Sequence, residues 1–92
     1  MMNHLNNCLL LGRYRSIDII NDDIATLTIV INDFDGDITI PVIIGAEIAY
    51  QIIEKCEEDC MIGIKGKIDV NEHGIIIKAE KLTFLLHKER AD

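Results

Sequence analysis

The sequence predicts a single all-β domain with one helix, in which five strands close into a small barrel. The length of 92 residues suits one hydrophobic core and is too short for two. Hydrophobic residues make up 49% of the chain but aromatic ones 4%, so the core is expected to consist of Ile, Leu and Val, which favour strands. The apolar segments follow in the order of three strands, one helix and two strands, with short turns between most of them.

The first two strands are expected at residues 5–20 and 24–31, separated by a turn at residues 21–23. Gly12 lies within the first of these segments, at a place where a long strand bends or forms a bulge. The second segment alternates, but both of its faces are mostly apolar. We therefore expect both faces to be covered.

A tight hairpin is expected after the second strand, because Asp35-Gly36 is a pair that favours such turns. It returns the chain into a third strand at residues 37–44. Pro41 cannot donate a ladder hydrogen bond, so the third strand is expected to lie at an edge or to contain a bulge there.

Residues 45–59 form the predicted helix, which is long enough to cover one end of a barrel. Apolar residues recur there at helical spacing, with polar residues on the opposite side. The side expected to be buried comprises Ile48, Ile52, Ile53 and Cys56. Tyr50 is also expected in the core.

The last two strands are expected at residues 61–70 and 75–86, joined by a turn at Gly74. In the fourth strand one face is apolar and the other is polar, so one face is expected in the core and the other in solvent. The expected core residues of the two strands are Ile62, Ile64, Ile68, Val70 and Phe84.

A closed five-stranded barrel hides the edges of so few strands, and a helix between the third and fourth strands is the arrangement of the OB fold. We therefore predict an OB-fold barrel with the order β-β-β-α-β-β. The predicted domain spans residues 1–87, followed by a short polar tail at residues 88–92.

Composition also limits where the protein works. The longest nearly apolar stretch, residues 38–46, is shorter than the roughly 20 residues that a membrane helix needs. The odd cysteine count of three, in a sequence without a secretion signal, argues against an extracellular disulfide framework. We therefore expect a cytoplasmic protein that contacts no membrane and keeps its cysteines reduced.

Charge is unevenly distributed along the chain. The formal net charge of −7 argues against a generic polyanion binder, because Lys and Arg supply most non-specific affinity for nucleic acids. However, the net charge is +2 over residues 1–15, −10 over residues 16–59 and +1 over residues 60–92. A sheet shared by the first and last segments would therefore be locally basic.

Several segments together resemble the bacterial single-stranded DNA-binding protein family, to which the primosomal replication protein is related. The matching segments are MNHLNNCLLLGR at residues 2–13, LTIVIN at 27–32, AEIA at 46–49, MIGIKGKI at 61–68 and AEKLTFL at 79–85. Their order and spacing cover nearly the whole chain, which is similar to a short, divergent member of this family.

The resemblance implies an OB-fold module that binds single-stranded DNA in replication, recombination or repair. It also implies a homo-oligomer, dimeric or tetrameric, that pairs through the first strand, with replication proteins as further candidate partners. Carried across, Arg13 matches the arginine of the Gly-Arg motif, and Lys65 and Lys67 match polar positions of the fourth strand. Phe84 matches an aromatic position near the end of the fifth.

Single-strand binding requires basic side chains beside aromatic rings on which bases stack. The candidate contacts for DNA are Arg13, Tyr14, Arg15, Phe34, Lys65, Lys67, Lys78 and Lys81. The sequence contains no Trp, and its second turn is a short acidic segment, DFDGD. The alternative is therefore an OB-fold protein-interaction or assembly module that has lost DNA binding.

Catalytic and metal-binding patterns are weaker. No glycine-rich phosphate loop, metal-spaced His-Glu pair or nucleophile-elbow serine occurs, so we expect no enzymatic activity. The aspartates of residues 33–37 do not have the spacing of a calcium loop. Cys56 and Cys60 with His73 or His87 form a less favoured zinc set. We expect neither a metal nor a cofactor.

Overall fold

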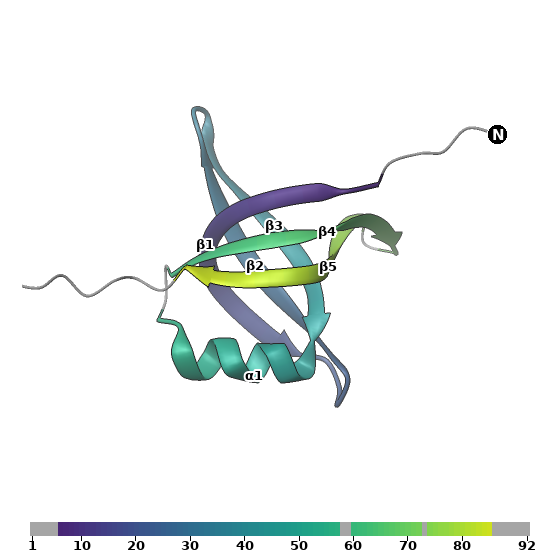
Figure 1. Cartoon of the computed structure of the whole chain (residues 1–92). Helices are drawn as coiled ribbons and strands as arrows, with labels where there is room; N and C mark the ends of the chain where they lie inside the picture. Colours follow the sequence, from purple (N-terminus) through teal and green to yellow (C-terminus); the bar gives the residue numbers. More distant parts are fainter. Residues whose placement is uncertain (1–5, 58–59, 73, 86–92) are drawn as a thin grey trace, which may run out of the picture.

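The computed structural model describes residues 6–57, 60–72 and 74–85. Its elements are β1 (Cys8–Ile19), β2 (Ile24–Asp33), β3 (Gly36–Gly45), α1 (Ala46–Lys55), β4 (Met61–Asn71) and β5 (Gly74–Leu85). The strands close into a barrel in the order β1-β2-β3-β5-β4, with α1 across one end (Figure 1). The predicted OB fold is confirmed. The polar tail predicted at residues 88–92 lies outside the described residues.

The first strand takes part in both halves of the barrel. Residues 8–13 of β1 pair with β4, and residues 13–19 pair with β2, with a register shift between Tyr14 and Ser16. Within the described residues, β3 and β5 close the barrel by parallel pairing at Val42 with Ile77 and at Ile43 with Lys78. Pro41 directly precedes this pairing, where β3 has β2 on one side alone. The third strand is therefore not an edge strand, because the closed order places it between β2 and β5, but Pro41 itself lies where one side of β3 has no strand partner among the described residues.

The interior of the barrel is aliphatic. Alternate residues of β2 point inward, and Ala25, Leu27 and Ile29 are completely buried between the other strands and α1. The other barrel residues of this core are Val42, Ile44, Ile62, Ile64 and Ile77. The outer face of β2 is also covered in part, because Val30 is 1% exposed.

The buried side of α1 differs from the predicted one. Ala46, Ala49 and Ile52 are buried, whereas Ile48 and Ile53 are 36% and 49% exposed. Small alanine side chains let the helix approach the barrel end, so its contact face is centred on them. Tyr50 points away from the barrel and is 58% exposed, so its predicted core position is wrong. Cys56 is buried as predicted.

The helix is also shorter than the predicted segment. It follows Gly45, and the Ala46 N–H donates a hydrogen bond to the Asp23 carbonyl at 2.9 Å, which fixes its start beside the β1–β2 turn. Among the described residues, no helix has the length and the apolar character that crossing a membrane requires.

The β4–β5 hairpin continues beyond the barrel. Pairing between β1 and β4 begins at Cys8 with Gly66, so β5 is the one strand partner of later β4 residues within the described residues. The Asn6 side chain adds two hydrogen bonds to Ile68, donating to its carbonyl at 3.0 Å and accepting from its N–H at 2.9 Å. Ile68 and Val70 lie in this extension and are 48% and 68% exposed, so their predicted core positions are wrong. Gly74 turns the hairpin with φ of +123°, a conformation that glycine adopts without strain.

The backbones of β4 and β5 approach closely where β5 contains one extra residue. Lys65 pairs with Lys81 but Gly66 pairs with Ala79, so Glu80 is the bulged residue. A Cβ at Gly66 would lie 2.3 Å from the Lys78 carbonyl oxygen. Residue 66 must therefore be glycine for the bulge to form without distortion.

We predict that Gly66→Ala lowers the free energy of unfolding by about 1–3 kcal/mol, as overpacking against backbone does. The matched control is Gly63→Ala on the same strand, where the nearest atom to a new Cβ is the Thr83 carbonyl oxygen at 3.9 Å. Urea denaturation of both variants measures the difference. Equal stability of the two would show that the close approach at Gly66 is not a constraint.

Candidate nucleic-acid interface

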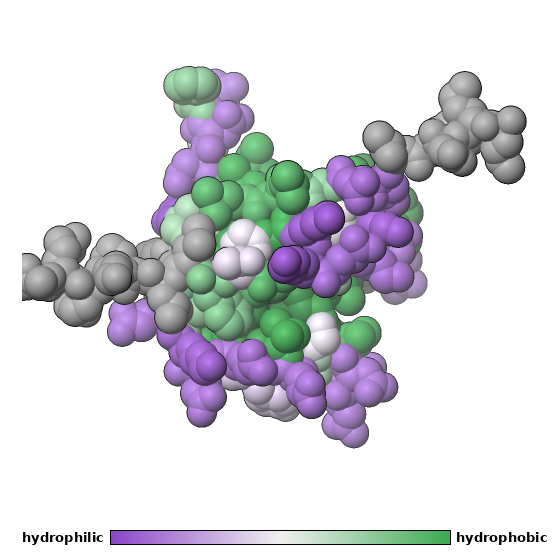
Figure 2. All heavy atoms as spheres, in the orientation of Figure 1, coloured by the Kyte–Doolittle hydropathy of each residue, from purple (hydrophilic) through white to green (hydrophobic). Residues whose placement is uncertain are grey.

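Four of the predicted contact residues gather on the outer surface of β4 and β5. Lys65 is directly opposite Lys81, and Lys67 is directly opposite Lys78. The bulge at Glu80 makes this possible, because Lys78 and Lys81 are three residues apart and would otherwise point to opposite faces. All four lysines are exposed, and Figure 2 shows hydrophilic side chains beside apolar ones on this side of the molecule.

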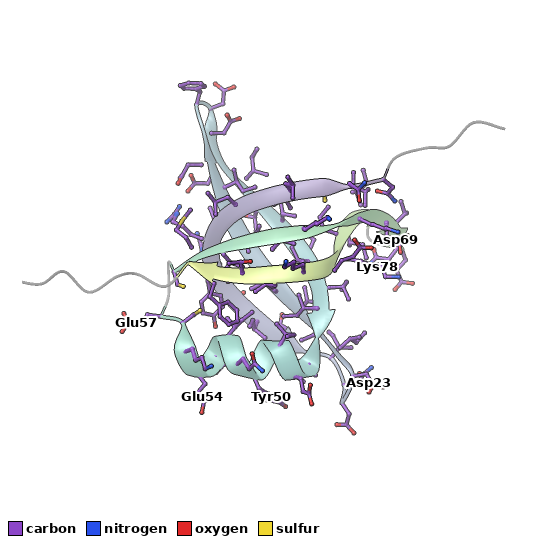
Figure 3. All side chains as sticks on the ribbon, in the orientation of Figure 1. Asp23, Tyr50, Glu54, Glu57, Asp69 and Lys78 are labelled. Carbon is purple, nitrogen blue, oxygen red and sulfur yellow. The ribbon has the colours of Figure 1, made fainter. Side chains whose placement is uncertain are left out.

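The two lysine pairs differ in their counter-charges. The Lys67 Nζ is 3.4 Å from a Glu80 carboxylate oxygen, and the Lys78 Nζ is 3.3 Å from a carboxylate oxygen of Asp69. Figure 3 shows Asp69 and Lys78 on this hairpin. Lys65 and Lys81 have no ion pair with any described residue. Because like charges directly opposite each other are unfavourable, the pair of Lys65 and Lys81 favours a bound anion.

Asp69 is held in its ionised form. Its carboxylate accepts a hydrogen bond from the Val70 N–H at 2.8 Å. This backbone hydrogen bond and the Lys78 ammonium lower the pKa of Asp69. Asp69 is therefore charged at neutral pH and offsets part of the positive charge of Lys78.

A shallow groove of about 240 Å³ crosses β1, β4 and β5, and both Lys65 and Lys81 line it. The residues that line this "lysine groove" are Leu9, Leu10, Leu11, Gly63, Ile64, Lys65, Lys81 and Thr83. Leu9 and Leu11 are 79% and 51% exposed, so the groove combines an apolar surface with two ammonium groups.

Our sequence prediction did not include these leucines. A signal for them existed, because three consecutive leucines in a strand cannot all face the core.

The two predicted arginines lie elsewhere on β1. Arg13 pairs with Met61, whereas Leu9, beside the groove, pairs with Lys65 at the other end of the same ladder. Arg13 is half-buried, and its guanidinium is 3.8 Å from Asp37 of the β2–β3 hairpin. Arg15 is exposed at the register shift of β1. The six basic residues therefore do not line one continuous groove.

The predicted stacking residues do not line the groove either. Tyr14 is half-buried against the core, and its backbone N–H donates to the Cys60 carbonyl at 2.8 Å. Phe34 is fully exposed in the turn between β2 and β3. Phe84, expected in the core, packs against it and is partly buried.

The two cysteines near the end of α1 belong to the hydrophobic core. Cys56 and Cys60 are buried in the core cluster. Burial, together with the neighbouring Cys60 thiol, raises the pKa of Cys56 to about 12, so Cys56 is a neutral thiol at physiological pH. Among the described residues, no group of three His, Cys, Asp or Glu side chains is arranged to hold a metal ion. His73 and His87 of the less favoured zinc set lie outside the described residues.

Comparison with solved structures shows several barrels of the same fold. A small single-stranded DNA-binding protein from Mycoplasma pneumoniae is 18% identical, with 94% of this chain and 100% of that chain covered and a TM-score of 0.71. The N-terminal domain of PriB from Thermoanaerobacter tencongensis, described as dimeric, is 11% identical, with 89% and 98% covered and a TM-score of 0.69. The SSB domain of a Synechococcus protein is 12% identical, with 89% and 98% covered and a TM-score of 0.64.

At these identities the similarity shows the OB fold and does not assign residues to a function. No protein-family model matches the sequence, and no curated protein matches it.

Proposed function

We propose that this chain is a cytoplasmic, non-enzymatic module that binds single-stranded DNA at the lysine groove, in replication, recombination or repair. The observation that carries the proposal is the directly opposed pair of Lys65 and Lys81, without a counter-charge among the described residues, beside exposed leucines. The similar structures that are named as single-stranded DNA-binding proteins support it.

The chemistry of the groove suits a flexible strand. The ammonium groups of Lys65 and Lys81 would contact phosphates, and Lys67 and Lys78 would extend the basic surface along the β4–β5 hairpin. Exposed Leu9 and Leu11 would contact bases without stacking on them. Each stacked base contributes about 1–3 kcal/mol in proteins that supply aromatic rings, so binding here would depend mainly on charge and little on sequence.

The remaining predicted contacts have secondary places in this proposal. Arg15 and Tyr14 on β1 would contact single-stranded DNA where it leaves the groove. Arg13 would also contact it, but there the DNA would compete with Asp37 for the guanidinium. We leave Phe34 out of the DNA path, because the aspartates beside it would repel phosphates.

Self-association through the first strand is the second part of the proposal. One edge of β1 over residues 8–11 pairs with β4, and its other edge has no strand partner among the described residues. Antiparallel pairing of this edge with the same edge of a second copy would join two barrels through one continuous sheet. Leu9 and Leu11 would then be partly covered by the partner subunit. A tetramer would require a further contact between such pairs.

A protein-interaction or assembly module remains the second candidate. It is favoured by the exposed apolar side chains of Leu9, Leu11 and Phe34 and by the lack of aromatic residues in the groove.

We predict that fluorescence anisotropy with labelled oligo-dT shows saturable binding that weakens steeply between about 20 and 200 mM salt. Lys65→Ala with Lys81→Ala should weaken binding about tenfold or more. The slope of the logarithm of affinity against the logarithm of salt concentration should become shallower by the amount expected for roughly two phosphate contacts. Lys55→Ala on exposed α1 is the matched control and should change little. A folded protein without binding at low salt would favour the second candidate.

Removing the counter-charges of Lys67 and Lys78 should have the opposite effect. Asp69→Asn and Glu80→Gln release Lys78 and Lys67, so we predict that together they strengthen oligo-dT binding several-fold at low salt. Asp22→Asn with Asp23→Asn in the exposed β1–β2 turn removes the same two charges away from the groove and serves as the control. If the control strengthens binding as much, net charge and not the position of the lysines determines affinity.

Pairing through β1 predicts that Leu9→Glu with Leu11→Glu converts the associated protein to monomers in sedimentation velocity, because carboxylates would face each other across the interface. Ile75→Glu is the control, since Ile75 is 70% exposed on the β4–β5 extension and should leave association unchanged. Dissociation by both variants would show that apolar surface in general, not the β1 edge, holds the copies together.

A further inference from the structure

The β2–β3 hairpin presents an aromatic side chain at its end. The two strands pair from Ile24 with Gly45 up to Asp33 with Gly36, so Phe34 and Asp35 form the turn itself. Phe34 is fully exposed, at 104%. The hairpin projects beyond the barrel in Figure 1, and Figure 2 shows its apolar end above hydrophilic sides. A large aromatic side chain in such a position is available to a partner.

The hairpin is held rigidly up to its turn. Gly36 adopts a φ of +136°, which allows the strands to meet there. The Asn32 side-chain amide donates a hydrogen bond to the Asp37 carboxylate, which also lies 3.8 Å from the Arg13 guanidinium. The backbone that carries Phe34 is therefore held by the paired strands, so little backbone entropy would be lost when the tip binds.

Charge surrounds this aromatic ring. Asp33 and Asp35 flank Phe34 in the sequence, and both are exposed without an ion pair to any described residue. We call residues 33–35 the "hairpin tip". A surface that receives it must offer an apolar site beside positive charge.

The lysine groove has these properties. Leu9, Leu11 and Ile64 provide an apolar lining, and Lys65 and Lys81 provide ammonium groups beside it. Benzene binds in an apolar cavity of about 150 Å³, so a phenyl ring is small enough for a groove of about 240 Å³. The two surfaces are therefore complementary in size, polarity and charge.

A barrel cannot join its own two surfaces, because the paired hairpin holds its tip away from β4 and β5 (Figure 1). We propose that the hairpin tip of one copy docks in the lysine groove of a second copy, with Phe34 on the leucines and Asp33 and Asp35 beside Lys65 and Lys81. This contact joins the hairpin tip of one copy to the lysine groove of another. Each of the two copies therefore still has either a groove or a tip with which to bind a further copy. It therefore extends assemblies beyond the pair formed through β1, and it does not require DNA binding.

Sedimentation velocity over a wide range of protein concentrations at low salt tests this contact. The wild type should form species larger than the β1 pair, and Phe34→Ala should weaken their formation tenfold or more, as loss of an aromatic anchor does. Ile38→Ala is the matched control, because Ile38 is 46% exposed on the same hairpin but outside the tip. Equal behaviour of Phe34→Ala and the wild type would overturn the proposal.

A mixing experiment tests which surfaces meet. Phe34→Ala retains the groove but lacks the aromatic tip, and Lys65→Glu with Lys81→Glu retains the tip but reverses the charge of the groove. Each variant alone should stop at the β1 pair, and an equal mixture should form larger species. No growth in the mixture, with both variants folded by circular dichroism, would refute the contact between the tip and the groove.

Charge exchange separates this contact from DNA binding. Adding Asp33→Lys and Asp35→Lys to the variant with both groove glutamates should restore large species, although the acidic groove can no longer hold phosphates. Because the tip and DNA would compete for the same lysines, Phe34→Ala should bind a short oligo-dT at least as tightly as the wild type. Failure of oligo-dT binding in the wild type would overturn the proposed function alone, and failure of charge exchange would overturn this inference alone.

Discussion

The backbone of β4 passes so near to that of β5 at Gly66 that a side-chain carbon there would lie 2.3 Å from the Lys78 carbonyl oxygen. This approach accompanies the bulge at Glu80, and the bulge brings Lys78 and Lys81 to the same outer face. Lys78 also pairs with Ile43 of β3, where the barrel closes. One local backbone contact thus supports both the closed fold and the basic surface, so the candidate site cannot be separated from the architecture of the barrel.

The acidity of the chain and a basic site are compatible because most of the acidic residues lie away from the lysines. Acidic residues gather in the β2–β3 turn and near α1, where Figure 3 shows Asp23, Glu54 and Glu57, whereas the four lysines share the β4–β5 hairpin with Asp69, Glu72 and Glu80. Exposed charges are screened over about 8 Å at physiological ionic strength. A polyanion would therefore be attracted to one face and repelled from the ends, which favours a single orientation over high overall affinity.

Local patterns were sufficient to predict the strands, the helix and their order. The β-branched alternation of β2, Asp35-Gly36 and Gly74 act through neighbouring residues, and the structure confirms them. The buried face of α1 was wrong because Ala46 and Ala49 matter through their small size, which hydrophobicity does not reveal. The exposure of Ile68 and Val70 depends on where β1 begins to pair with β4, which no local pattern contains.

The candidate site was predictable as residue types but not as a surface. That lysines of β4 and β5 share a face depends on the bulge at Glu80, and its sole sequence signal is a glycine at position 66. Closure of the barrel involves short parallel pairing at Val42 and Ile43, next to Lys78. This contact has fewer paired residues than the antiparallel ladders on either side, so we expect its amides to open before theirs. An anion held by Lys78 would bind the closed barrel alone and so reduce the open population by mass action. Hydrogen exchange of the amides at this closure would therefore slow when the lysines are occupied. The rate of local opening between β3 and β5 would thus show whether a ligand is bound.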